Sequence, residues 1–208
     1  MSKYVAELIG TFFFVLVIGC TVVGNAPGVI PPLAIASALM VMIYAGGHHS
    51  GGHYNPAVTL GVWIRGRCET RDVLPYMVFQ INGAILASFA VTYLFPNAKH
   101  VALSPDIGRA LLVEFLFTFA LVYVVLNVAT AKATTGNSFY GLAIGFTVLI
   151  GAFAVGGISG GAFNPAGAVG ITLMGLSTFA NIWIFLVGNF AGGAAAALVF
   201  KGLNPQDV

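Results

Sequence analysis

The chain has 208 residues, of which 8 are lysine or arginine and 6 are aspartate or glutamate, so charged residues make up 7% of it. Soluble domains carry about 25% charged residues, whereas 59% of the residues here are apolar. This composition excludes a soluble globular enzyme and a disordered chain, because too little polar surface is available. The net charge of +2 supplies no basic field for phosphates, so we expect no nucleic-acid partner. The composition predicts a chain that lies in the lipid bilayer.

Six apolar stretches, bounded by proline, glycine, asparagine or charged residues, are candidates for helices that cross the membrane. They cover residues 4–24, the residues after Pro31 and Pro32 up to about 46, and residues 73–95, 107–131, 139–156 and 177–200. A crossing needs roughly 20 residues. The second stretch is short for this, and we expect that the chain does not reach the surface cleanly at its end. The sequence therefore predicts an all-α membrane protein with six transmembrane helices.

The basic residues between these stretches are unevenly distributed. With a cytoplasmic N-terminus, six of them fall on the cytoplasmic side and only Lys99 and Arg109 on the other. Basic residues favour the cytoplasmic side, so we predict a multi-pass protein of the cell membrane with both termini in the cytoplasm. Cys20 and Cys68 are predicted to differ too much in membrane depth to form a disulfide.

The chain contains an internal repeat. Residues 50–61 and 159–170 align without gaps and are identical at seven of twelve positions, and this alignment pairs Asn55 with Asn164. Residues 33–35 recur at the same spacing as residues 142–144, and Glu7 recurs near the start of the second half as Glu114. Each half holds three spans, an odd number, so the second copy must be inverted relative to the first. We predict a single channel domain with one repeat at about residues 1–98 and the other at about 106–208.

Each repeated segment contains the motif Asn-Pro-Ala after a glycine-rich stretch. The two motifs are Asn55, Pro56 and Ala57, and Asn164, Pro165 and Ala166. Asparagine is a good N-cap, and proline is favoured at the first helical position. We therefore expect short helices over residues 57–66 and 166–175, which enter from opposite faces and meet near the midplane.

The meeting point of these two helices has a predictable chemistry. Their positive dipole ends converge there and repel cations, while the two asparagine amides can hold the oxygen of a neutral molecule. This arrangement favours selective passage without a reaction. We accordingly expect no enzyme activity, no cofactor and no metal site.

Two Asn-Pro-Ala motifs in register, their Ser-Gly-Gly lead-ins and the two matching glutamates make the whole chain resemble the aquaporins of the major intrinsic protein family. The resemblance implies an aquaporin-like inverted repeat: six tilted helices plus two re-entrant half-helices meeting at the midplane, assembled as a homotetramer with one pore in each subunit. It also implies a selectivity filter nearer the outer face, at Ile35, Ala152, Gly161 and Gly167. The family's filter normally includes an aromatic residue and an arginine, and this sequence has neither at these four positions.

The arginine of the family's filter is replaced by Gly167, which predicts a wider and more apolar constriction than in a strict water pore. We therefore expect a passive channel for water and small neutral solutes such as urea, ammonia and glycerol. A strict water channel remains open, as does a proton-coupled transporter of a small solute with Glu7 or Glu114 as proton carrier. A structural junction protein is less favoured, because the loops at residues 25–32 and 96–106 are short.

Residues around the two motifs complete the predicted site. Glu7 and Glu114 are predicted to support the re-entrant loops by accepting backbone hydrogen bonds, as the resemblance also implies. Possible pore-loop residues are Gly51, Gly52, His53, Ser159 and Gly160. For His53 two interpretations are equally open: it directs a carbonyl or its ring into the pore, or it is a satisfied loop histidine.

Overall fold

The computed structural model describes residues 1–207, and Val208, the last residue of the predicted second repeat, lies outside the described residues. Residues 1–207 are helical, with no strand beyond one isolated bridge between Leu103 and Ser177. Within this part of the chain, six helical segments are long and apolar enough to cross a membrane, which confirms the predicted number of spans. They are α1 (Ser2–Val22), α2 (Ile30–Ser50), α4 (Thr70–Leu94), α5 (Ile107–Val125) with the π-helical turn Leu126–Thr130, α6 (Tyr140–Ser159), and α8 (Ile182–Leu203) after the 3-10 turn Phe179–Asn181.

The prediction that the second span ends early was wrong. Helix α2 has 21 residues and continues through the segment Gly47–His48–His49 to Ser50. Its two prolines lie in the first turn, where the missing backbone N–H has no helical partner to lose. The helix ends only where Gly51 takes a left-handed conformation, with φ of +88°. The second span is therefore long enough and apolar enough to cross a membrane.

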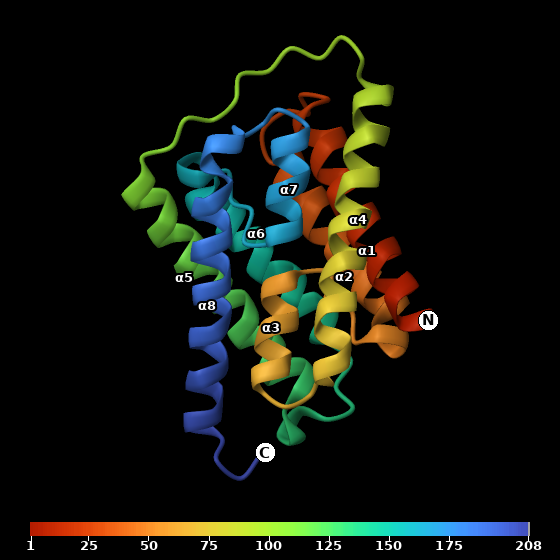
Figure 1. Ribbon diagram of the computed structural model, residues 1–208, viewed down its shortest axis with the longest axis vertical. Coiled ribbons are helices and arrows are strands. Elements are labelled where there is room, and N and C mark those ends of the chain that lie inside the picture. The colour runs from red at the N-terminus through yellow and green to blue at the C-terminus, as the bar shows by residue number, and fades with distance from the viewer. Residues whose placement is uncertain (208) are drawn as a thin grey trace.

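Two short helices lie between the long ones. They are α3 (Pro56–Ile64) and α7 (Pro165–Leu173), each of 9 residues and each capped by the asparagine of its motif. Nine residues span about 14 Å, which is less than half of the hydrocarbon core. Figure 1 shows α7 above α3 in the centre of the molecule, with the two helices placed nearly end to end. The predicted pair of re-entrant half-helices is confirmed.

The two repeats pack their first and third long helices in the same way. Helix α1 lies against α4, and α5 lies against α8. A Cβ at Gly83 of α4 would lie 2.5 Å from the carbonyl oxygen of Leu8, and a Cβ at Gly192 of α8 would lie 2.4 Å from that of Phe115. The absence of a side chain at these two positions, which are equivalent in the repeat, allows the backbones to approach closely.

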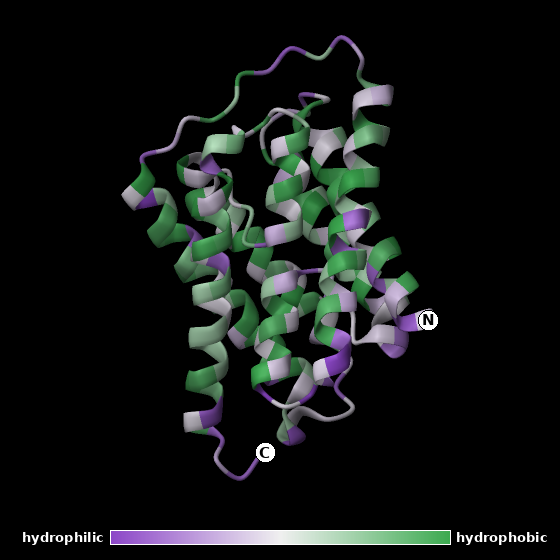
Figure 2. Cartoon of the chain, viewed as in Figure 1, coloured by the Kyte–Doolittle hydropathy of each residue, from purple (hydrophilic) through white to green (hydrophobic). Residues whose placement is uncertain are grey.

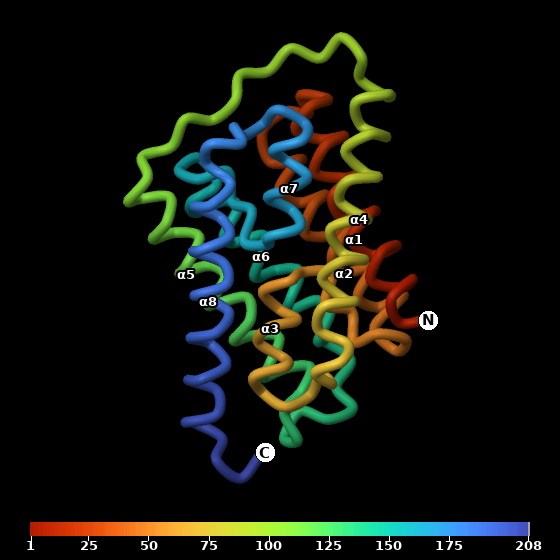
Figure 3. Tube along the Cα trace, in the orientation of Figure 1, coloured from red at the N-terminus to blue at the C-terminus, as the bar shows by residue number. Residues whose placement is uncertain are grey.

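The outward faces of the long helices are apolar, as the green colouring of Figure 2 shows. Large side chains such as Phe89, Leu74 and Leu198 are 65–70% exposed. Such a surface fits lipid and would not keep a monomer in water. The connection from α4 to α5 arches over the α7 end of the bundle (Figure 3), where the backbone N–H of Leu103 donates to the carbonyl of Leu176 at 3.0 Å.

Candidate pore

The two re-entrant loops have the same backbone conformation. In the first, Gly51, Gly52 and Tyr54 have φ of +88°, +65° and +49°. The equivalent residues of the second, Gly160, Gly161 and Phe163, have φ of +94°, +63° and +47°. Glycine takes this left-handed conformation without a steric penalty, which explains the glycine pair ahead of each motif. The chain therefore builds the same loop twice, once in each repeat.

Each motif asparagine caps its own half-helix. The side-chain oxygen of Asn55 accepts hydrogen bonds from the backbone N–H groups of Ala57 at 2.8 Å and Val58 at 3.4 Å. The oxygen of Asn164 accepts from Ala166 at 2.9 Å and Gly167 at 3.3 Å. These bonds satisfy two N–H groups at each helix start. They also fix both amide groups at the centre of the molecule.

The amide nitrogens of the two asparagines link the repeats. Nδ2 of Asn55 donates to the carbonyl of Phe163, and Nδ2 of Asn164 donates to the carbonyl of Tyr54, both at 2.9 Å. An amide nitrogen carries two N–H groups, and within residues 1–207 the second N–H of each asparagine meets no protein acceptor. Two fixed donors therefore remain for a molecule that passes between them.

Glu7 is buried beneath the first re-entrant loop. Its Oε1 accepts from the Ser50 hydroxyl at 2.6 Å and from the backbone N–H of His53 at 2.9 Å. Its Oε2 accepts from the backbone N–H of Tyr54 at 2.6 Å and from Nε2 of Gln80 at 2.7 Å. Each oxygen thus has two donors, and the carboxylate holds the loop in place.

Glu114 occupies the equivalent place beneath the second loop with one donor fewer. It accepts from the Ser159 hydroxyl at 2.6 Å and from the backbone N–H groups of Ala162 at 3.0 Å and Phe163 at 2.8 Å. Asn189 stands at the position of the second repeat that corresponds to Gln80. Its side chain is one methylene shorter, and within the described residues its buried Nδ2 has no hydrogen-bond partner. The two repeats therefore differ in the side chain that stands beside the buried glutamate: Gln80 donates to Glu7, whereas Asn189 does not reach Glu114.

Three cavities lie along the axis of the two half-helices. The α7 cavity, of about 340 Å³, is lined by all four predicted filter residues, Ile35, Ala152, Gly161 and Gly167, together with Ser159 and Gly160. The midplane cavity, of about 10 Å³, lies between Asn55 and Asn164 and also contacts Gly52 and His53. The α3 cavity, of about 410 Å³, is lined by residues that include Ser50, Gly51, His53, Arg67 and Lys132.

The three cavities adjoin one another, because neighbouring cavities share wall residues, and together they define a candidate path through the molecule. Phe14, Val148 and Ala162 line both the α7 cavity and the midplane cavity. His53 and Val125 line both the midplane cavity and the α3 cavity. The path therefore has two wide ends and one narrow point, which lies at the motif asparagines.

The electrostatic character of this path changes along its length. No charged side chain from residues 1–207 lines the α7 cavity. The α3 cavity has Arg67 and Lys132 in its wall. At the centre, the starts of α3 and α7 together contribute roughly one unit of positive charge. The helix starts therefore repel a cation at the midplane, in addition to the basic residues of the α3 cavity, whereas a neutral molecule meets no such electrostatic barrier.

His53 combines the two properties that the sequence left open. Its Nδ1 shares a hydrogen bond of 3.1 Å with the Thr59 hydroxyl, so the ring is held by protein. The same residue lines two of the three cavities. Gln80 also donates to the Thr59 hydroxyl at 2.9 Å. Sequence reasoning missed Gln80 and Thr59, because neither belongs to a motif and their role depends on contacts across α1, α3 and α4.

Comparison with known proteins agrees with this geometry. The profile of the family described as "Major intrinsic protein" matches residues 1–200. Aquaporin NIP1-3 of Oryza sativa subsp. japonica is 36% identical over 219 residues, covering 99% of this chain and 75% of the relative. Probable aquaporin NIP4-2 of Arabidopsis thaliana is 34% identical over 216 residues, covering 99% of this chain and 76% of the relative.

A solved structure shows the same fold. The aquaglyceroporin from Plasmodium falciparum superposes with a TM-score of 0.84 at 23% sequence identity, covering 99% of this chain and 97% of the other. The aquaporin-like fold expected from the two motifs is therefore present. The chain belongs to the major intrinsic protein family, whose aquaporins are membrane channels for water and small solutes and not enzymes.

Proposed function

We propose that this chain is a passive channel for water and for small uncharged solutes such as urea, ammonia and glycerol. The observation that carries the proposal is the wall of the α7 cavity. Ile35, Ala152, Gly161 and Gly167 line it together, and it contains no charged side chain from residues 1–207. Without an arginine at Gly167, this end has neither the bulk nor the charge that would restrict entry to water.

The two buried carboxylates favour passive conduction over proton-coupled transport. Neither Glu7 nor Glu114 lines any of the three cavities. Their oxygens accept hydrogen bonds from the re-entrant loops, and a proton on either oxygen would break part of this network. A proton carrier needs access to the path and an arrangement that tolerates both protonation states. The contacts of these residues support the role of loop supports.

The proposed orientation places both termini, and the α3 cavity, on the cytoplasmic side of a cell membrane. Arg67 and Lys132 line this cavity, and basic residues favour the cytoplasm. Cysteines introduced at Val101, which is 94% exposed, and at Gly136, in a variant without Cys20 and Cys68, would test it. An impermeant maleimide added to intact cells should label only position 101, and labelling of position 136 alone would reverse the orientation.

We also propose a homotetramer with a separate pore in each subunit, as in the family that the chain resembles. The broad apolar outer faces of the long helices (Figure 2) provide surface both for subunit contacts and for lipid. Native mass spectrometry of detergent-solubilised protein would report the number of chains. A monomer under all mild detergents would contradict this assembly.

The substrate proposal is tested by stopped-flow measurements on proteoliposomes with the wild type, Gly167→Arg and Gly167→Ala. A Cβ at Gly167 would approach Asn164 no closer than 3.4 Å, so a β-carbon fits without moving the backbone. Arginine should reduce urea and glycerol flux while water flux persists, because it adds bulk and charge to the α7 cavity. Alanine, the uncharged control, should change both fluxes little.

Three other results would overturn the proposal. Wild-type liposomes that pass water and exclude urea, ammonia and glycerol would indicate a strict water channel. Uptake that saturates and follows a proton gradient would indicate a transporter. Liposomes no more permeable than empty ones would mean that the chain conducts none of these molecules.

A further inference from the structure

The narrow point of the path is the midplane cavity. The midplane cavity measures about 10 Å³, against about 340 and 410 Å³ for the cavities on either side. A volume of about 10–15 Å³ on this scale holds a single water molecule. The midplane cavity is therefore the smallest of the three by far.

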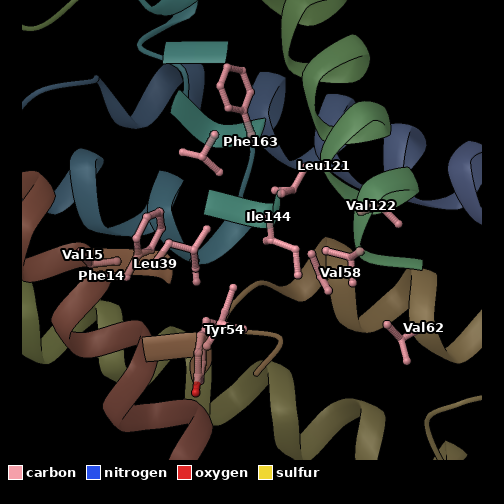
Figure 4. Close-up of a cluster of buried hydrophobic side chains, with 14 of the residues drawn as sticks. Phe14, Val15, Leu39, Tyr54, Val58, Val62, Leu121, Val122, Ile144 and Phe163 are labelled. Atoms are coloured by element: carbon pink, nitrogen blue, oxygen red, sulfur yellow. The ribbon is translucent and has the colours of Figure 1, made fainter. Parts of the chain in front are cut away.

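Eight apolar side chains line the midplane cavity beside the two asparagines, Val125 and Ala162 among them. The other six, here called the midplane collar, are Phe14, Leu39, Val58, Leu121, Ile144 and Val148. They come from α1, α2, α3, α5 and α6, and each is at most 6% exposed. Figure 4 shows five of them, Phe14, Leu39, Val58, Leu121 and Ile144, converging from these helices on one region.

The collar is built from both repeats. Leu121 follows Phe14 at the spacing that also relates Glu114 to Glu7, and Val148 follows Leu39 at the spacing of the two motif asparagines. These two pairs place equivalent side chains on both sides of the pseudo-two-fold axis. Their common position at the cavity wall follows from the duplication, and not from a local motif.

The pairing fails for the other two members of the collar. Ile144 corresponds to Ile35, which lines the α7 cavity and not the midplane cavity. The alignment of the two motifs pairs Val58 with Gly167. Val58 lines the midplane cavity, whereas Gly167 lines the α7 cavity. One half-helix thus carries a branched side chain next to its asparagine, and the other carries none.

We propose that the midplane collar, with Phe14 as its largest member, sets the size limit of this channel in place of the α7 cavity. The inference rests on the proposed function. Phe14 lines both cavities, so its ring marks the boundary where the path narrows. A solute at this point meets the two free asparagine N–H groups and His53, and otherwise an apolar wall. A molecule with several hydroxyls loses more hydration there than urea or water does.

The test compares collar variants with a matched variant outside the collar. Phe14→Ala and Phe14→Leu reduce the collar side chain, and leucine already stands at the equivalent position 121. Ile35→Ala tests the competing location, the predicted filter, because Ile35 lines the α7 cavity and not the midplane cavity. The measured quantity is glycerol permeability divided by water permeability in proteoliposomes. This ratio corrects for differences in the amount of active protein.

If the collar sets the limit, Phe14→Ala should raise this ratio by about tenfold, the effect that a few methylene groups have on discrimination in an apolar site. Phe14→Leu should raise it less, and Ile35→Ala should leave it unchanged. Should Phe14→Ala not fold, Phe14→Leu and Val148→Ala test the same wall with smaller changes.

A ratio that rises with Ile35→Ala but not with Phe14→Leu or Val148→Ala would place the limit in the α7 cavity and overturn the inference. That outcome would leave the proposed function intact, because the wild type would still conduct. A wild type that conducts nothing would instead remove the proposed function, and the inference with it.

Discussion

Asn55 and Asn164 each hold the backbone that precedes the other. Asn55 donates to the carbonyl of Phe163, the residue before Asn164, and Asn164 donates to the carbonyl of Tyr54, the residue before Asn55. The two hydrogen bonds thus connect opposite halves of the chain in a reciprocal way. The half-helices are therefore fixed to each other as well as to their own loops, and the pore amides share one rigid centre.

Replacing either asparagine by alanine should destabilise the protein by about 2–4 kcal/mol, because it removes an N-cap and leaves a buried carbonyl without its donor. Unfolding of Asn55→Ala and Asn164→Ala in detergent micelles, followed by circular dichroism, measures this. Asn82→Ala is the control, since Asn82 is exposed and bonds only within its helix, to Val78. Equal stability of all three variants would refute the structural role of the cross-links.

Glu7→Gln should destabilise the protein more than Glu114→Gln. A glutamine amide has one acceptor oxygen, and its NH₂ group takes the place of the other carboxylate oxygen. At position 7 this NH₂ group would face two of the present donors in either orientation of the amide. At position 114, in the better orientation, it would face only the backbone N–H of Phe163. Each unmatched buried donor costs about 1–3 kcal/mol. Parallel unfolding curves in one detergent would measure the difference, and the reverse order would contradict it.

The substitutions Gln80→Asn and Asn189→Gln should have opposite effects on stability. Gln80→Asn shortens the side chain that donates to Glu7 at 2.7 Å, so we expect a loss of about 1–3 kcal/mol. Asn189→Gln brings the unpartnered amide within reach of Glu114, and we expect a gain of about 1 kcal/mol. Thermal unfolding of both variants tests the pair, and destabilisation by Asn189→Gln would mean that α5 and α8 leave no room for the methylene.

Asp207, in the chain segment after α8, binds to residues at the α3 end of the molecule. Its Oδ1 lies 2.8 Å from Nη2 of the buried Arg65, and its Oδ2 accepts the backbone N–H of Lys132 at 2.8 Å. The pKa of Asp207 lies below its ordinary value because of these contacts. The hydrogen bond from the backbone N–H of Lys132 lowers it more than the charge of Arg65 does. Because the pKa is lower in the folded state, this fastening is present at neutral pH and is lost as pH falls through the folded-state value, below about 4.

Hydrogen exchange of the Lys132 amide reports this contact. We expect Asp207→Asn to accelerate exchange at neutral pH, and the wild type to lose protection, relative to its intrinsic exchange rate, only in strong acid. Asp106→Ala is the control: Asp106 caps α5 through the backbone N–H of Arg109, so Arg109 should exchange faster and Lys132 should not. Unchanged exchange of Lys132 in Asp207→Asn would show that the ion pair does not hold this segment.

Much of the fold could be predicted because its signals are local or periodic. The apolar stretches predicted six spans, and the asparagine and proline of each motif predicted both half-helices, since caps act within three residues. The end of α2 was predicted too early, at about residue 46, because glycines and histidines look like a boundary. In the structure only the left-handed turn at Gly51 ends the helix.

The sequence by itself determined the membrane environment, the duplicated half and the place of the two asparagines, because composition, spacing and capping need no knowledge of distant contacts. Tertiary structure alone decided which apolar side chains form the midplane collar. The collar joins Phe14 to Leu121 and Leu39 to Val148 across the molecule. Such contacts depend on how the helices pack at positions like Gly83 and Gly192. Hydrophobic periodicity cannot separate a residue that faces lipid from one that faces a narrow pore, since both are apolar.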